Sequence, residues 1–308
     1  MSPSVSVQIF IGLPLIALVF SILEQCRPLV RQRLFRQGWK ADIAYYALGS
    51  ILGQFSTAGS LAAMLMLRHV MGFDLGRLAA RQPDWLQVVE IVLISDFSGY
   101  LFHRLLHSNR WLWRFHKVHH SSRQMDWLAA ARLHPVDKLL GDFVQLVPLL
   151  CLGFGDQPLL VYAGILGFQM FLNHANVRVN LGPLRWIVAG PDFHQWHHCE
   201  NPAAYNRNFA PHLVIFDRLF GTAHIPSTRI RPWKYGVREK TPEGFWRQML
   251  HPFRETVRAT RRLRLTKAFE VQKSWDGIKT EMHMTKASCL LGAALLLAVL
   301  KDRAGAAP

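Results

Sequence analysis

The sequence predicts an all-α protein, built as a polytopic membrane helical bundle with a histidine-rich helical cap on the cytoplasmic side. Three observations lead to this fold class. Half of the 308 residues are hydrophobic, these residues fall in long uninterrupted runs, and eight histidines lie in three short clusters. Long apolar runs are typical of transmembrane helices. Histidines spaced three or four residues apart share one face of a helix and can act together.

Residues 5–23 form the first apolar segment. It lacks a clear small-residue cleavage site, so we expect a helix retained in the mature protein rather than a removed signal peptide. Residues 43–67 and 86–102 are the next two apolar segments. At 1.5 Å per residue, each of the three segments crosses or nearly crosses the ~30 Å hydrocarbon core of a bilayer.

Two shorter apolar segments, residues 139–154 and 158–172, are joined by a turn-like Gly-Asp-Gln at 155–157. We expect a helical hairpin whose two short helices either just span the bilayer or enter it and return. In both cases the two ends of the hairpin lie on one side of the membrane. The bundle then has about four main transmembrane or re-entrant helices plus this hairpin. Residues 287–300 hold only about two-thirds of the ~20 residues that a span needs, and suit an interfacial anchor, a short crossing or a packing helix.

Positive charge after the first segment sets the expected orientation. The short loop there carries Arg27, Arg31, Arg33, Arg36 and Lys40. Such loops favour the cytoplasmic side, which puts the amino terminus outside. Counting crossings from there brings the end of the third segment and both ends of the hairpin to the cytoplasmic face, where all three histidine clusters can meet.

The formal net charge of +16 is concentrated in juxtamembrane loops and in the C-terminal tail. Cations and apolar residues alternate loosely over residues 253–269, which suits either a helix on the membrane surface or a solvated basic helix. We therefore expect anionic lipid headgroups, and not nucleic acid, as the partner. The four cysteines form no CxxC pair, which argues against a zinc ribbon, a disulfide framework and an iron–sulfur cluster.

The spacing within the histidine clusters indicates metal ligands. "HRLLH" places two histidines four residues apart, whereas "HKVHH" and "HQWHH" place one histidine three and four residues before two others. Each cluster can present two or three imidazoles from one helical turn. Imidazole binds zinc, copper, iron and nickel. Eight or nine such ligands exceed what one ion can use, so the pattern predicts two metals side by side.

Acidic residues near the clusters are candidates for orienting the imidazoles, because metal-bound histidines usually donate their other N–H to a carboxylate or carbonyl. Asp96 precedes His103 by seven residues, with Tyr100 between them. A carboxylate inside a membrane helix is costly and therefore a functional candidate, although a polar group satisfied within the bundle is the alternative. Asp192 and Asp217 lie near the third cluster and suit either orienting roles or surface and cap roles.

The ordered set of three clusters resembles the sterol desaturase and fatty acid hydroxylase superfamily of membrane non-haem di-iron enzymes. The resemblance covers roughly residues 96–222. Its supporting matches are Asp96 and Tyr100, "HP" at 134–135, "NHANV" at 173–177, "LGPLRW" at 181–186 and "FDRLFGT" at 216–222. It implies two iron ions held by histidines at the cytoplasmic membrane face, O2 as co-substrate, and hydroxylation or desaturation of a lipid such as a fatty acyl chain, sterol or ether lipid.

The resemblance also implies a ligand set. The implied metal ligands are His103, His107, His116, His119, His120, His194, His197 and His198, with His174 as the ninth. Some members of the family carry another histidine four residues after the counterpart of His174, where this chain has Arg178. His134 is the alternative ninth ligand, or a hydrogen-bonding partner of the ligands. We divide the chain into N-terminal transmembrane helices (1–85), a catalytic domain (86–225) and a basic tail with a short apolar helix (226–308).

The di-iron centre itself would carry the chemistry, without a protein nucleophile. Electrons must come from a separate reductase, ferredoxin or cytochrome, because the chain shows no GxGxxG turn, no CxxCH and no cysteine cluster. The compact length fits a bacterial inner-membrane protein. A zinc metalloprotease is disfavoured because Arg104, Lys117 and Gln195 stand where HExxH needs glutamate. A non-catalytic membrane metal-binding or scaffold protein that retains the clusters is the alternative.

Overall fold

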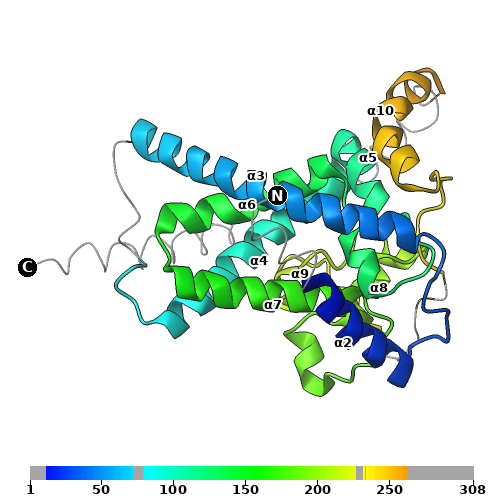
Figure 1. Ribbon diagram of the computed structural model, residues 1–308, viewed down its shortest axis with the longest axis horizontal. Helices are drawn as coiled ribbons and strands as arrows, with labels where there is room; N and C mark the ends of the chain where they lie inside the picture. Colours follow the sequence, from blue (N-terminus) through cyan, green and yellow to red (C-terminus); the bar gives the residue numbers. More distant parts are fainter. Residues whose placement is uncertain (1–11, 72–78, 227–231, 233, 263–308) are drawn as a thin grey trace, which may run out of the picture. The chain divides into compact units, whose positions relative to one another are not determined.

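The structure is a computed structural model that describes residues 12–71, 79–226, 232 and 234–262 (Figure 1). These residues form helices and isolated β-bridges, without a strand, which confirms the all-α class for this part of the chain. The helices are α2 (Leu13–Cys26), α3 (Trp39–Met71), α4 (Asp84–Ser108), α5 (Arg110–His119), α6 (Pro135–Leu152), α7 (Asp156–His174), α8 (Pro191–His197), α9 (Val214–Leu219) and α10 (Phe245–Arg262), with 3-10 helices η2 (Trp127–Ala131), η3 (Gly182–Trp186) and η4 (Pro202–Ala204).

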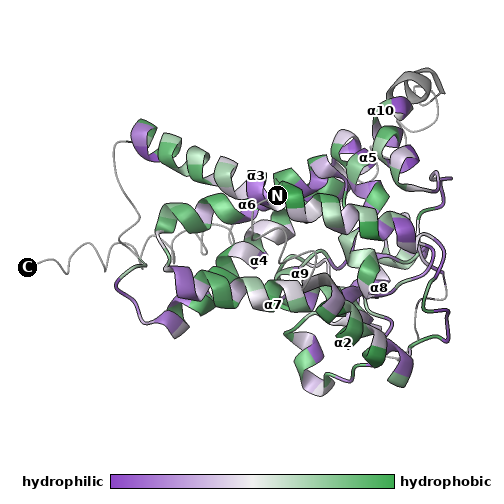
Figure 2. Cartoon of the chain, viewed as in Figure 1, coloured by the Kyte–Doolittle hydropathy of each residue, from purple (hydrophilic) through white to green (hydrophobic). Residues whose placement is uncertain are grey.

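Two of the described helices, α3 and α4, are long and apolar enough to cross a membrane, with 33 and 25 residues. They contain the second and third predicted apolar segments. The first predicted segment overlaps α2, a shorter apolar helix of 14 residues. The predicted hairpin corresponds to α6 and α7, of 18 and 19 residues. In Figure 2 the hydrophobic residues of these helices are coloured green. The total number of crossings stays a prediction.

The break between α4 and α5 separates the first two histidine clusters. Asn109 ends α4 and begins α5, where its side chain accepts hydrogen bonds from the backbone N–H groups of Trp111 (2.9 Å) and Leu112 (3.1 Å). An asparagine in this position satisfies N–H groups that have no partner within the helix. The first cluster therefore lies at the end of α4, and the second lies at the end of α5.

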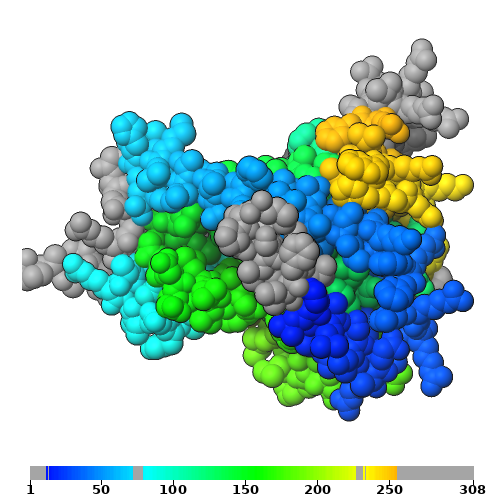
Figure 3. All heavy atoms as spheres, viewed as in Figure 1, coloured from blue at the N-terminus to red at the C-terminus, as the bar shows by residue number. Residues whose placement is uncertain are grey.

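The apolar helices pack together around the histidine-bearing segments. α6 contacts α3 and α4, while α7 contacts α4, η2 and α8. One buried core joins α4 to the hairpin through Ile91, Leu149 and Tyr162. Another joins α2 to η2 and α7 through Phe20 and Trp127. In Figure 3 the side chains of α3 extend along one face of the molecule. This packing holds the ends of α4, α5 and α7 near one another.

A buried network of ion pairs fixes the loop after α2. Arg36 donates to the carboxylates of Asp42 (2.7 Å) and Asp126 (2.6 Å). Arg132 donates to both oxygens of Asp42, at 2.5 and 3.0 Å. All four residues are buried, and buried charges are tolerated when they are paired and hydrogen-bonded. The network joins the loop, the start of α3 and the two ends of η2.

The chain divides into two compact units, residues 1–252 and 253–308, and the boundary falls within the residue range of α10. The predicted surface helix over 253–269 lies partly outside the described residues, and the apolar run 287–300 lies wholly outside them. The three-part division of the chain at 85 and 225 stays a prediction.

Candidate metal centre

Nine buried or partly buried histidines converge in two groups, in each of which the candidate ligand nitrogens lie within 4.8 Å of one another. The five-histidine group contains His103, His107, His116, His120 and His197, and the four-histidine group contains His119, His174, His194 and His198. The groups are neighbours, since the rings of His120 and His198 stack with centroids 4.3 Å apart. The structure thus brings together all eight cluster histidines and His174.

One helical turn serves both groups. In α5 and at its C-cap, His116 and His120 belong to the five-histidine group, while His119 belongs to the four-histidine group. Around α8 the assignment is reversed. His194 and His198, four residues apart, belong to the four-histidine group, whereas His197 belongs to the five-histidine group. Residues four apart share a helix face, whereas adjacent residues point about 100° apart. The HxxHH spacing therefore divides its imidazoles between two neighbouring centres.

The Nε2 atoms approach each other within these groups. The Nε2–Nε2 distances are 3.0 Å for His103–His116, 3.2 Å for His116–His120, 3.2 Å for His119–His174, 3.1 Å for His174–His194 and 3.0 Å for His194–His198. Imidazole nitrogens that each bind one ion at about 2.0–2.1 Å would lie within about 4.2 Å of one another. The Nε2 atoms of His107 and His197 are buried without a hydrogen-bond partner among the described residues. This donor set fits metal ions.

The opposite nitrogens donate to fixed oxygen acceptors. The Nδ1 contacts are His103 to Phe209 O (2.7 Å), His197 to Arg207 O (2.7 Å), His174 to Met170 O (2.9 Å), His119 to Arg132 O (3.3 Å) and His116 to Asp137 Oδ2 (2.8 Å). An oxygen acceptor requires the proton on Nδ1, which leaves the Nε2 lone pair directed toward its group. These acceptors therefore fix both the tautomer and the orientation of five rings.

The electrostatic environment keeps the imidazoles neutral. Burial, together with repulsion between neighbouring histidines, lowers pKa values well below the ordinary range. This applies to His116, His119, His120, His194, His197 and His198. Metal ligation requires an unprotonated nitrogen, so these side chains are in the ligating form at neutral pH.

Asp96 and Asp217 accept hydrogen bonds from backbone N–H groups in the segment that lies next to the histidine groups. The Asp96 carboxylate accepts from the N–H groups of His212 (2.7 Å) and Leu213 (2.9 Å). Asp217 accepts from the N–H groups of Phe209 (2.9 Å) and Ala210 (2.7 Å). Together they hold residues 206–213, which we call the acceptor loop. This loop supplies the carbonyls of Arg207 and Phe209, which accept from His197 and His103.

The remaining predicted residues lie apart from the imidazole nitrogens. The Tyr100 hydroxyl is 3.1 Å from Thr222 Oγ1 and accepts from Arg104 Nη1 at 3.2 Å. Asp192 lies 3.8 Å from Arg185. His134 begins α6, where Nδ1 accepts from Val136 N (3.1 Å) and Nε2 donates to Met249 O (3.2 Å). Both nitrogens of His134 are thus engaged outside the two groups.

Asp137 is a site residue that the sequence interpretation missed. It lies in the first turn of α6 and is buried, and its carboxylate accepts from His116. The sequence did offer one signal for this residue, because Asp137 is an acidic residue just after "HP" at 134–135 and just before the apolar run 139–154.

A matched pair of histidine variants tests the assignment of His174. We expect His174→Ala to lose about half of the bound metal, because it removes a member of the smaller group. His134→Ala should keep the metal. It should lose the capping contact with Val136 N and the hydrogen bond to Met249 O, at a cost of about 1–3 kcal/mol. Metal content per chain, measured by mass spectrometry, checks both. Equal metal loss in the two variants would contradict this assignment.

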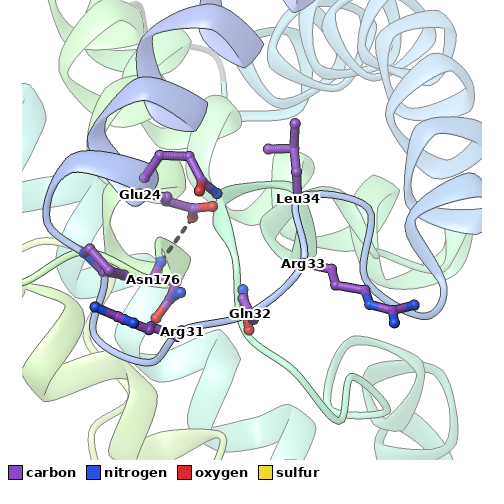
Figure 4. Close-up of a pocket in the computed structure, with 8 residues that line it drawn as sticks. Glu24, Arg31, Gln32, Arg33, Leu34 and Asn176 are labelled. Carbon is purple, nitrogen blue, oxygen red and sulfur yellow. Dashed lines mark hydrogen bonds between the residues drawn. The ribbon is translucent and has the colours of Figure 1, made fainter.

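A separate cavity of about 370 Å³ lies beside the loop after α2 (Figure 4). The Glu24 carboxylate there accepts from the N–H groups of Asn176 (2.9 Å) and Trp127 (2.8 Å). These bonds tie α2 to the segments that follow His174 and the second histidine cluster. The cavity is lined by Glu24, Gln25, Pro28, Arg31, Gln32, Arg33, Leu34 and Asn176, so its lining is distinct from the two histidine groups.

Comparisons with known proteins match the part of the chain that contains this centre. A family model described as fatty acid hydroxylase matches residues 88–222. An ornithine lipid hydroxylase of Rhizobium tropici is 37% identical over 172 residues, which is 56% of this chain and 51% of that protein. An alkylglycerol monooxygenase of Xenopus tropicalis is 35% identical, over 41% of this chain and 28% of that protein.

A methylsterol monooxygenase of Rattus norvegicus is 30% identical over 46% of this chain and 49% of that protein. The chain therefore spans about half the length of these relatives, or less. No solved structure matches the chain significantly.

Proposed function

The chain belongs to the fatty acid hydroxylase family through residues 88–222, and on that premise we propose that it is a membrane-bound non-haem di-iron oxygenase. It uses O2 to hydroxylate or desaturate a C–H bond of a lipid. The observation that carries the proposal is the pair of neighbouring groups of five and four imidazoles. Imidazole nitrogen is a good iron ligand, and two groups correspond to two ions.

The substrate is a lipid with an alkyl portion, such as a fatty acyl chain, a sterol or an ether lipid. The three relatives named above carry names of enzymes that act on an ornithine lipid, an alkylglycerol and a methylsterol, which supports a lipid substrate here. The two apolar helices α3 and α4 support a membrane location. The centre faces the cytoplasm of a bacterial inner membrane.

When bound, two iron ions would supply the activation of O2 and the oxidation of the C–H bond. The chain's own residues hold, orient and shield these ions. The two histidine groups are the ligands, and Asp137, the acceptor loop and the carbonyls of Met170 and Arg132 fix ring orientation. Burial of the imidazoles limits access of bulk water. A separate reductase, ferredoxin or cytochrome delivers the electrons.

Metal analysis combined with lipidomics tests the proposal. Membranes that contain the wild-type chain should hold two irons per chain and an oxygenated or newly unsaturated lipid. His197→Ala should lower iron affinity by at least about tenfold and remove the lipid product. His69→Ala is the matched control, because His69 is an exposed residue near the end of α3. A single bound zinc, with identical lipids in all three samples, would instead identify a non-catalytic metal-binding protein.

A further inference from the structure

An exposed apolar surface is formed by η3 and α9, two short elements that contact each other. We call it the η3–α9 patch. Its members are Leu184 (55% exposed), Trp186 (47%), Ile187 (52%), Ile215 (51%) and Leu219 (63%). The backbone joins the two halves, since Val214 N–H donates to Ile187 O at 2.8 Å. Exposed apolar side chains that gather on adjoining elements are typical of an interaction surface.

Two arginines flank the tryptophan of the patch. The guanidinium carbons of Arg185 and Arg218 lie 5.8 and 5.6 Å from the centre of the Trp186 ring. Arg218 also donates to the Trp186 carbonyl at 3.3 Å. Tryptophan is enriched at the headgroup level of membranes, and basic side chains there attract anionic lipids. The composition of the patch therefore fits a lipid surface.

The patch continues the exposed apolar face of α4. Phe97, Leu101 and Leu105, four residues apart, are 39%, 46% and 48% exposed on that candidate span. The Phe97 ring packs against Phe216 of α9 at 5.3 Å and against Phe220 at 6.3 Å. A surface that faces acyl chains on α4 thus leads directly onto α9.

The position along α4 at which α9 packs gives the depth of α9 in the membrane. Phe97 lies five residues before Phe102, where the apolar run of α4 ends. At 1.5 Å per residue this separation is about 8 Å. Helices that lie in the membrane interface bury their apolar face about 5–10 Å into the boundary between headgroups and acyl chains. Asp96 accepts hydrogen bonds from the N–H groups of His212 and Leu213, just before α9, and these bonds fix this level.

We propose that the η3–α9 patch inserts into the leaflet that borders the histidine groups, with Arg185 and Arg218 bound to anionic phospholipid headgroups. The acceptor loop directly precedes α9, so insertion also fixes the depth of the histidine groups beneath the membrane surface. The inference concerns membrane contact and does not depend on the metal or on catalysis.

Spin labels on the full-length chain in nanodiscs of phosphatidylcholine and phosphatidylglycerol test the proposal. Leu219→Cys is labelled in a background where Cys26, Cys151, Cys199 and Cys289 are alanine. We expect the label to collide several-fold more with O2, which partitions into lipid, than with a water-soluble nickel chelate. Tyr205→Cys is the control, because Tyr205 is 42% exposed and precedes the acceptor loop. Its label should collide mainly with the chelate. Equal chelate access at both positions would overturn the proposal.

A second measurement uses the unmodified protein, in case the cysteine-free background fails to fold. Phosphatidylglycerol that carries a photoreactive diazirine near the glycerol end of its acyl chain is activated in the same nanodiscs. Mass spectrometry should find adducts on residues 184–187 and 215–219, and fewer near Trp186 when phosphatidylcholine carries the diazirine instead. Adducts confined to other segments would contradict insertion of the patch.

Discussion

Replacing Asp42 by alanine is expected to lower the free energy of unfolding by about 3–5 kcal/mol, because it removes the shared partner of two buried guanidinium groups. Asp42 accepts from Arg36 at 2.7 Å and from Arg132 at 2.5 and 3.0 Å. Arg36 would retain Asp126, but Arg132 would lose its carboxylate partner. The loss should appear in a denaturant titration of the protein in detergent micelles, followed by circular dichroism.

Asp142→Ala is the matched control for this experiment. Asp142 pairs with Lys138 at 2.6 Å, and both side chains are partly exposed, at 23% and 24%. Exposed pairs contribute less than about 1 kcal/mol, since water screens the charges. If the two variants lost similar amounts of stability, the buried network would not be the feature that holds the loop after α2.

Replacing Asp137 by alanine is expected to weaken metal binding by about 10–100-fold, the usual effect of losing a carboxylate that orients a ligating histidine. Asp137 accepts from His116 Nδ1 at 2.8 Å. Without it the ring loses the contact that fixes its tautomer, and only the five-histidine group is affected directly. One of two bound ions should therefore leave at a lower chelator concentration than in the wild type.

A chelator titration with metal content as the readout measures this effect, and Asp137→Asn adds a second arm. Asparagine keeps an oxygen acceptor, so its variant should bind metal more tightly than the alanine variant. Asp142→Ala again serves as the control, because it removes a carboxylate from the same helix without touching a histidine. Identical chelator midpoints for wild type and Asp137→Ala would refute the orienting role.

Much of the fold follows from apolar runs, since a stretch such as 86–102 can be stable only as a buried or lipid-facing helix. The bounds do not follow, because polar residues at the helix ends also join the helix. α4 continues past residue 102 to Ser108, and it stops where Asn109 can begin α5 with its side chain. The buried ion pairs were equally hidden in the sequence. Arg36 was interpreted only as juxtamembrane charge, whereas it lies in a network with Asp42 and Asp126.

The histidines of the candidate centre were predictable because their spacing is local and helical. Their division into two groups was not, because it depends on which neighbouring helix each ring faces. The acceptors were harder still. Carbonyls such as those of Arg207 and Phe209 leave no trace in a side-chain pattern, and only the folded loop brings them to His197 and His103. The choice between His174 and His134 likewise depends on tertiary packing.

The alternation of histidines between the two groups makes α5 and the turn around α8 sensitive to changes in chain length. His119 and His120 face different groups, as do His197 and His198. Inserting or deleting one residue within either turn would rotate the imidazoles that follow in that turn by about 100°. These imidazoles would no longer face the groups that they face now. Point substitutions can therefore alter one ligand at a time, whereas a shift of register would dismantle both halves of the centre.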